Sequence, residues 1–151
     1  MPSGRVEITH VGNQTYAAFI RDHELTTDQP VEAGGGDDGL TPVELFVVSL
    51  ASCVGYYAGR FLQRHHVPDE HLRIRADFTM ATDRPARVAS IRLQVRVPQE
   101  LDPARLEALR AVVDHCTVHN TLRQPPEITL AFGSPTIGPT PTGGSAPSGL
   151  S

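Results

Sequence analysis

The stretch TPVELFVVSLASCVGYYAG, residues 41–59, decides the fold, because a strong helix start is followed there by a long apolar run. Thr41 is a suitable N-cap, Pro42 fits the first helical position, and Glu44 completes a capping box. After this first turn the residues are apolar or small on every side of a helix, so no face is suited to water. The sequence therefore predicts a long buried helix that runs to about His65.

Two interpretations account for the burial of this helix. Its charge-free part, Leu45–Gly59, contains several small residues that let a second helix approach closely. We expect an intertwined oligomer in which the helix is buried between subunits; alternatively, the helix is enclosed by the chain's own sheet and its second helix. Because the charge-free part has 15 residues and a bilayer requires about 20, no membrane span is predicted.

Residues on both sides of the helix alternate between apolar and polar, which indicates antiparallel strands with one solvated face. The predicted strands are residues 6–10, 15–20, 72–80, 91–97 and 127–132. A polar loop joins Arg21 to Leu40, and a second helix begins at Asp102–Pro103, reaches Cys116 and is followed by a turn at 120–125. The order ββ-α-ββ-α-β predicts an α+β fold.

The chain has 151 residues, which fits one domain, and we assign that domain to residues 4–133. Residues 134–151 are mostly Pro, Gly, Ser and Thr, so a disordered tail is predicted there. All 13 basic residues are Arg, which excludes Schiff-base catalysis and a lysine-dependent phosphate loop. The net charge of -4 gives no reason to bind nucleic acid or an anionic membrane. Without a signal peptide, we expect a soluble cytoplasmic protein with reduced thiols.

Two cysteines are the main candidates for chemistry. Cys53 lies in the middle of the predicted buried helix, and Cys116 lies on the apolar face of the second helix, so the two side chains are expected to meet in the core. In a reducing compartment such a pair indicates redox chemistry or metal binding rather than a permanent bridge. Inert packing is the alternative, because free cysteine is often buried as a small apolar residue.

A reactive thiol needs a nearby cation, because burial raises the pKa of a thiol and a mid-helix position gains nothing from the helix dipole. Arg21 is the leading candidate, since it ends the second predicted strand and carries a permanent charge. Glu44 is the candidate for orienting that guanidinium through an ion pair. The alternatives are a solvated Arg21 and a Glu44 that serves only as a helix cap.

A zinc site is a further alternative, in which His115, Cys116 and His119 would join Cys53 as ligands. His115 and Cys116 are adjacent on the predicted helix and point apart, and the sequence contains no Cys-x-x-Cys pair. We therefore predict that no metal is bound.

Several motifs in a fixed order resemble the osmotically inducible protein C (OsmC) family, which includes the organic hydroperoxide resistance (Ohr) proteins. The motifs are IRDH (20–23), DQP (28–30), GGDDG (35–39), TPVEL (41–45), SLASC (49–53) and HCTVHNTL (115–122). The resemblance covers nearly all of residues 4–133.

The resemblance implies an OsmC-like fold, with antiparallel sheets wrapped around two central helices of an intertwined homodimer. It also implies a thiol peroxidase for organic or fatty-acyl hydroperoxides, in which Cys53 becomes a sulfenic acid and Cys116 then forms an internal disulfide with it. A dithiol or a lipoylated protein would be the reductant, and no cofactor is implied. An arginine and a glutamate complete such sites at the subunit interface, and Arg21 and Glu44 are expected in those roles.

Three positions depart from the pattern of the peroxidatic branches. Val43 stands where those branches carry Glu, as in a broader OsmC-like branch. Thr117 replaces a proline that commonly follows the second cysteine, and Arg21 belongs to an Arg-Xaa-His pattern of the broader branch. Other arginines are therefore alternative cations: Arg5, Arg60 and Arg64.

A second functional hypothesis is non-enzymatic. In it, the same dimer binds a lipid-like molecule in an apolar pocket and the cysteines only pack. In the peroxidase hypothesis, apolar residues near Cys53 favour a greasy peroxide; they are Phe46, Leu50, Tyr56 and Tyr57.

Overall fold

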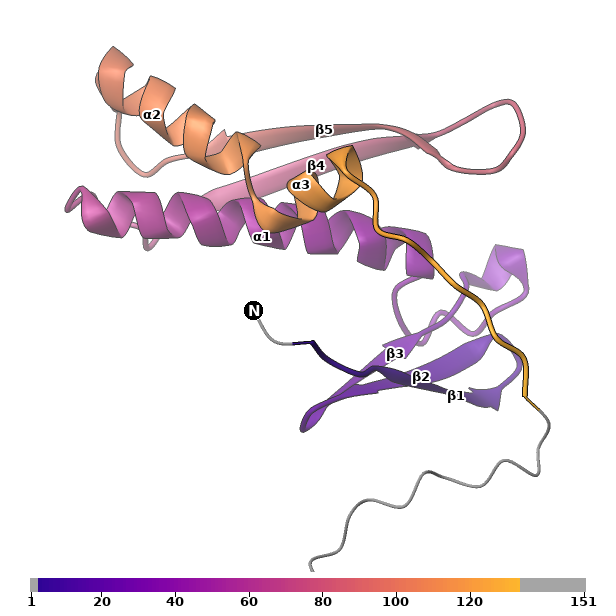
Figure 1. The fold of residues 1–151 in the computed structure, drawn as a ribbon. Coiled ribbons are helices and arrows are strands. Elements are labelled where there is room, and N and C mark those ends of the chain that lie inside the picture. Colours follow the sequence, from indigo (N-terminus) through magenta and orange to yellow (C-terminus); the bar gives the residue numbers. More distant parts are fainter. Residues whose placement is uncertain (1–2, 134–151) are drawn as a thin grey trace, which may run out of the picture.

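The computed structural model describes residues 3–133, which form an α+β fold with two antiparallel sheets (Figure 1). In chain order the elements are β1 (Glu7–Gly12), β2 (Thr15–Ile20), β3 (His23–Thr27), the 3-10 turn η1 (Val31–Ala33), α1 (Pro42–Arg64), β4 (Arg73–Met80), β5 (Val88–Arg96), α2 (Pro103–Asp114) and α3 (Thr117–Arg123). The predicted α+β class is confirmed. The predicted tail, residues 134–151, lies outside the described residues, so the domain limits stay a prediction.

The start of α1 is built by the predicted capping box. The Thr41 hydroxyl accepts a hydrogen bond from the Glu44 amide at 3.1 Å, and the Glu44 carboxylate accepts one from the Thr41 amide at 2.9 Å. These two bonds satisfy amides that the first helical turn leaves without partners. The helix then continues without a break to Arg64.

Within one chain, α1 is packed on one face only. Its buried residues follow helical spacing and face β4, β5, α2 and α3: Val47, Leu50, Val54, Ala58, Phe61 and Leu62. The opposite face leaves Val48 and Tyr56 with 43% and 57% of their surface exposed, and Phe46, which lines a cavity beside β5, is 37% exposed. The second interpretation, in which the chain's own sheet and second helix enclose α1, is therefore wrong for the single chain.

By length and composition alone, α1 is long and apolar enough to cross a membrane, with a mean hydropathy of 1.5 over an 18-residue stretch. The sequence predicted no span because only the 15-residue charge-free part was compared with the thickness of a bilayer, whereas the whole helix has 23 residues. Core helices of soluble proteins meet the same criteria, and α1 is the central helix of this fold.

The two sheets contain the predicted hairpins β1–β2 and β4–β5. β3 was not predicted, because His23–Thr27 belongs to the stretch expected to be a polar loop. It pairs antiparallel with β2 through the two-residue turn Arg21–Asp22. The polar side chains of His23 and Glu24 obscure the alternation of this strand, whereas its backbone pairing with β2 does not depend on them.

The predicted last strand is wrong for the described chain. Residues 127–132 belong to no strand or helix. Ile128, Leu130 and Phe132 have 79%, 84% and 96% of their surface exposed. The alternation that predicted a strand is present, but within residues 3–133 no strand pairs with this segment.

The second helix ends earlier than predicted. α2 stops at Asp114, and Cys116 has an extended backbone, with φ -64° and ψ 151°, before α3 begins at Thr117. The predicted turn at 120–125 is therefore mostly the second half of α3. The Asn120 side chain donates a hydrogen bond to the His115 carbonyl at 3.0 Å, which stabilises the corner between the two helices.

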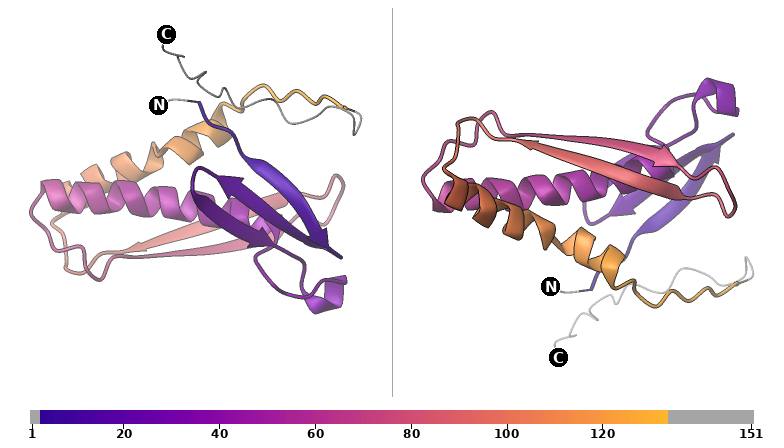
Figure 2. Two further views of the ribbon diagram at one scale, coloured as in Figure 1. Left: turned by 90° about the horizontal axis from the view of Figure 1, so that it is seen from below. Right: turned by 90° about the horizontal axis from the view of Figure 1, so that it is seen from above.

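α1 lies along the β4–β5 hairpin with α2 beside it (Figure 2). The β1–β2–β3 sheet lies near the N-terminal half of α1, on the side opposite α2 (Figure 1). Two apolar clusters fill the space between α1, α2 and the hairpin. One surrounds Leu62 and Leu109, and the other surrounds Leu50, Val54 and Cys116.

Candidate active site

The two cysteines meet in one apolar cluster. Leu50, Val54 and Cys116 form the buried part of this cluster, and the Cys53 side chain packs against it. Cys53 is partly exposed, whereas Cys116 has no exposed surface, and both are free thiols. The structure thus provides one accessible sulfur and one buried sulfur side by side.

The corner between α2 and α3 places Cys116 in this cluster. Its extended backbone at the N-cap of α3 turns the side chain toward α1 instead of along the surface of α2. Burial raises the pKa of the Cys116 thiol above its ordinary value, and the neighbouring Cys53 adds to that effect. The amides of His119 and Val118 act in the opposite direction. Cys116 is therefore held as a neutral thiol at neutral pH.

A hydrogen bond joins the two segments that carry the cysteines. The Tyr57 hydroxyl lies 2.8 Å from the Thr117 hydroxyl. Tyr57 is one helical turn beyond Cys53 on α1, and Thr117 directly follows Cys116. Tyr57 also packs against the cysteine cluster. The bond therefore fixes the start of α3 on α1 next to both sulfurs.

Arg21 lies in the turn between β2 and β3 and is exposed. Its φ of 52° is in the left-handed region, which non-glycine residues seldom adopt. No hydrogen bond or ion pair joins Arg21 to either cysteine among residues 3–133, so a single described chain does not bring these three groups together.

Glu44 is committed to the capping box at the N-terminus of α1. Its carboxylate accepts from the Thr41 amide, and it makes no ion pair with an arginine within the described chain. The cap accounts for Glu44 in one chain, and its predicted role beside an arginine stays untested.

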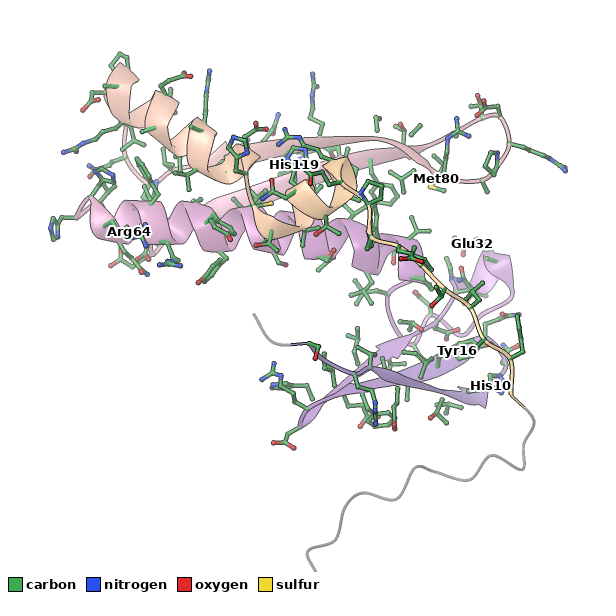
Figure 3. All side chains as sticks on the ribbon, viewed as in Figure 1. His10, Tyr16, Glu32, Arg64, Met80 and His119 are labelled. Atoms are coloured by element: carbon green, nitrogen blue, oxygen red, sulfur yellow. The ribbon has the colours of Figure 1, made fainter. Side chains whose placement is uncertain are left out.

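The other arginines offered as cations are also exposed. The Arg60 guanidinium lies over the Tyr56 ring at 5.6 Å and donates to the Tyr56 hydroxyl at 3.1 Å. Arg64 lies at the C-terminal end of α1 (Figure 3). Arg5 precedes β1. None of the three forms a hydrogen bond or ion pair with a cysteine in the described part of the chain.

The residues of the zinc alternative do not converge. Among residues 3–133, no group of three or more His, Cys, Asp or Glu side chains is arranged to hold a metal ion. His119 instead lies 3.8 Å from the Asp114 carboxylate through its Nδ1 atom. Arg123 donates to the same carboxylate at 2.8 Å and holds the pKa of Asp114 below its ordinary value.

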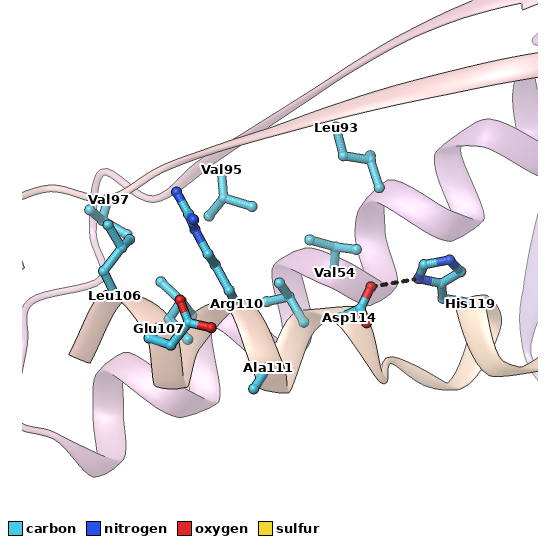
Figure 4. Close-up of a pocket in the computed structure, with 12 residues that line it drawn as sticks. Val54, Leu93, Val95, Val97, Leu106, Glu107, Arg110, Ala111, Asp114 and His119 are labelled. Atoms are coloured by element: carbon cyan, nitrogen blue, oxygen red, sulfur yellow. Dashed lines mark ion pairs between the residues drawn. The ribbon is translucent and has the colours of Figure 1, made fainter. Parts of the chain in front are cut away.

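A groove runs between α2 and β5 (Figure 4). Its main cavity is about 600 Å³, and a second of about 380 Å³ continues from it along β5, with Leu93 and His119 lining both. Val54 from the cysteine cluster also lines the main cavity. Neither cysteine is among the residues that line the two cavities.

Residues 34–131 match the family model described as OsmC-like protein. The chain is a member of the OsmC-like family. The family assigned from the sequence motifs is thereby confirmed, and this match includes the segments of both cysteines.

Solved structures share the fold of this OsmC-like protein at low sequence identity. One from Psychrobacter arcticus 273-4, named as an osmotic stress induced and detoxification response protein, is 24% identical, with a TM-score of 0.72 over 80% of this chain and 89% of that chain. The organic hydroperoxide resistance protein OsmC from Legionella pneumophila is 16% identical, with a TM-score of 0.62 over 82% and 90%. The organic hydroperoxide resistance protein OhrB of Bacillus subtilis is 17% identical, with a TM-score of 0.59 over 82% and 92%. No curated protein gives a match.

The sequence predicted that the cysteines would meet, but it missed two polar contacts around them. One is the Tyr57–Thr117 hydrogen bond, and the other is the Asp114–His119–Arg123 cluster. The sequence offered one indication of the first contact, which is that Tyr57 and Thr117 each lie within a helical turn of a cysteine. Which two hydroxyls meet depends on the corner between α2 and α3, which the sequence did not predict.

Proposed function

We propose that this OsmC-like protein is a thiol peroxidase that reduces organic hydroperoxides. The observation that carries the proposal is the contact between the partly exposed Cys53 and the buried Cys116 in one apolar cluster. An accessible sulfur suits attack on a peroxide, and a buried neighbour suits closure of a disulfide afterwards. Apolar side chains around Cys53 favour an organic peroxide over hydrogen peroxide.

The proposed reaction has three balanced steps. The Cys53 thiolate attacks the terminal oxygen of the hydroperoxide, so an S–O bond forms, the O–O bond breaks and the alkoxide takes up a proton to leave as an alcohol. The Cys116 thiol then attacks the sulfenic sulfur, and the hydroxyl leaves as water with the thiol proton. An external dithiol or lipoylated protein opens the disulfide by two thiol–disulfide exchanges.

The proposal assigns Arg21 to stabilising the Cys53 thiolate and Glu44 to orienting the guanidinium. In one chain Arg21 lies on a surface turn. In an intertwined homodimer, Arg21 of one subunit would therefore have to reach Cys53 of the other. Three exposed apolar features support self-association: the free face of α1, the three-stranded sheet and the unpaired segment 127–132. Exposed apolar surface of this kind often marks a protein–protein interface.

The decisive experiment is turnover of tert-butyl and cumene hydroperoxide with dithiothreitol as reductant. The parent protein should consume peroxide catalytically, and Cys53→Ser should lose turnover completely while its far-ultraviolet circular dichroism stays unchanged. Persistent turnover in Cys53→Ser would refute the assignment. Glu44→Gln is an informative companion, because the amide oxygen can still accept from Thr41 while the charge that would orient an arginine is lost.

The groove between α2 and β5 favours a second candidate function. Its volume of about 600 Å³ is within the range of small-molecule sites, and eight of its twelve lining residues are apolar, which fits a protein that binds a lipid-like molecule with a polar group. Titration of free thiols after one equivalent of cumene hydroperoxide separates the two functions. A peroxidase loses both thiols to one intramolecular disulfide, whereas a binding protein with packed cysteines retains them.

A further inference from the structure

We propose that the hydrogen bond between Tyr57 and Thr117 is a positioning contact that holds Cys116 against Cys53 for disulfide closure. This inference rests on the proposed function and assigns two residues to its second step. In that step an S–S bond forms, the S–O bond of the Cys53 sulfenic acid breaks, and water leaves.

The first argument is the location of the bond. α1 and α3 are joined by this 2.8 Å contact one turn from Cys53 and one residue from Cys116. Among residues 3–133, no other side-chain hydrogen bond connects α1 with α3. A directional bond at this position sets how far the N-terminus of α3 can move along or away from α1.

The second argument is the need for such a constraint. Cys116 lies in a two-residue corner between helices and forms no side-chain cap. The amides of His119 and Val118 that act on its sulfur belong to α3 itself, so they do not anchor the corner to α1. Apolar packing alone tolerates sliding, because it has no preferred direction. The Tyr57–Thr117 bond adds direction where the packing provides none, and disulfide formation is strict in its geometry.

The third argument concerns the open and closed states of the corner. Without the bond, the reduced protein gains conformations in which Cys116 moves away from α1. The disulfide form cannot follow, so the equilibrium shifts toward the dithiol. Because coupling is reciprocal, closing the disulfide also strengthens the hydrogen bond. An exposed hydrogen bond contributes modestly, and we expect its loss to lower the disulfide equilibrium constant about 2- to 10-fold.

The test is a redox titration of the full chain in glutathione buffers, with the Cys53–Cys116 disulfide quantified by alkylation and mass spectrometry. Tyr57→Phe and Thr117→Val should each lower the equilibrium constant about 2- to 10-fold, Thr117→Ser should retain it, and the double variant should lose no more than either single variant. Tyr56→Phe is the matched control, because it removes the neighbouring hydroxyl, whose one hydrogen bond within residues 3–133 is from Arg60.

A kinetic measurement separates positioning from a general loss of stability. In Tyr57→Phe, the dimedone-trappable sulfenic acid should persist longer relative to the rate at which it forms, because the loss falls on the second step. Because Tyr57→Phe keeps the ring in the cluster, it should fold with a thermal midpoint near that of Tyr56→Phe. Equal disulfide equilibrium constants in the parent and Tyr57→Phe would overturn the positioning role. A parent protein that forms no Cys53–Cys116 disulfide in any glutathione buffer would overturn the proposed function as well.

Discussion

Cys53 and Cys116 lie against each other although one is in the middle of a long helix and the other is at a corner between two helices. The contact depends on the end of α2 at Asp114. If α2 continued, Cys116 would lie further along the axis of α2 instead of in the corner that faces α1. The asymmetry in exposure between the two sulfurs follows from the same corner. Cys53 keeps access to solvent, and Cys116 is completely enclosed.

Removing the buried sulfur should uncouple the two halves of the proposed reaction. In Cys116→Ala, Cys53 should still react once with cumene hydroperoxide, since the attacking sulfur is unchanged. The sulfenic acid should then persist or be oxidised further by excess peroxide, because no neighbouring thiol can resolve it. Intact-mass measurement after graded peroxide addition checks this, with a mass gain of one oxygen followed by further oxygens. A sulfenic acid that disappeared as fast as in the parent, without further oxidation of Cys53, would contradict the pairing.

Local signals in the sequence were sufficient to predict α1 and two hairpins. The capping box of Thr41 and Glu44 is a local interaction, and strand alternation is local as well. The corner at Cys116 was not predictable in this way, because nothing in the neighbouring residues forbids a continuous helix. The failure of the segment 127–132 to pair has a related cause, since alternation specifies a strand but not the strand that it joins.

The same limit applies to the candidate site. Sequence position predicted that Cys53 and Cys116 would be close, and the structure places them in one cluster. It did not predict where the Arg21 guanidinium lies, because a hairpin turn moves with its sheet. The β1–β2–β3 sheet lies on the side of α1 away from the β4–β5 hairpin (Figure 1).

Arg21 can be tested by a substitution that suits its backbone. Its φ of 52° is unfavourable for a side chain by about 1 kcal/mol and costs glycine nothing. Arg21→Gly should therefore fold with a stability within about 1 kcal/mol of the parent, because relief of strain offsets the greater freedom of the unfolded chain. If Arg21 stabilises the Cys53 thiolate, the rate of peroxide reduction should fall at least about 10-fold. Unchanged rates would move this role to Arg5, Arg60 or Arg64, which can be substituted in turn.

Asp28 should make the fold sensitive to acid. Only 1% of its surface is exposed, and its carboxylate accepts from the amides of Gln29 at 2.7 Å and of Gly36 and Asp38 at 3.1 Å. The amide of Asp38 makes the largest contribution to lowering the pKa of Asp28 below its ordinary value of 3.8. A lowered pKa in the folded state means that this stabilisation is fully present above pH 3.8 and is lost as the pH falls through the folded value.

The corresponding experiment compares the free energies of urea unfolding of the parent and Asp28→Asn from pH 7 down to the lowest pH at which both proteins still fold. The variant should be less stable at pH 7, because its amide group can present only one acceptor oxygen to three donors. The difference between the two proteins should shrink as the pH falls below 3.8, because the unfolded parent then binds a proton at Asp28 more readily than the folded parent, and it should level off once the pH is below the folded pKa. A difference that stays constant at all pH values would show that charge at Asp28 does not matter.

Leu62 should be one of the residues on which stability depends most. It is fully buried in the cluster with Ala58, Phe61 and Leu109. Leu62→Ala should lower the free energy of unfolding by about 2–5 kcal/mol, since it removes apolar contacts and leaves a cavity. Val31→Ala is the control, because Val31 is 69% exposed and its truncation should change stability by less than about 0.5 kcal/mol. Both are measured by urea unfolding at one protein concentration, because self-association would couple stability to concentration.

The free face of α1 provides the test of the proposed homodimer. Ser52 is exposed there, one turn from Val48 and Tyr56, which also remain largely exposed. If this face packs against the same helix of a second subunit, Ser52→Arg should place a like charge opposite itself and a bulky side chain where small residues permit close approach. Light scattering coupled to size exclusion should then give a dimer for the parent and a shift toward monomer for the variant. A parent that stays monomeric at millimolar concentration would instead leave the α1 face in water and remove the route by which a second chain brings Arg21 to Cys53.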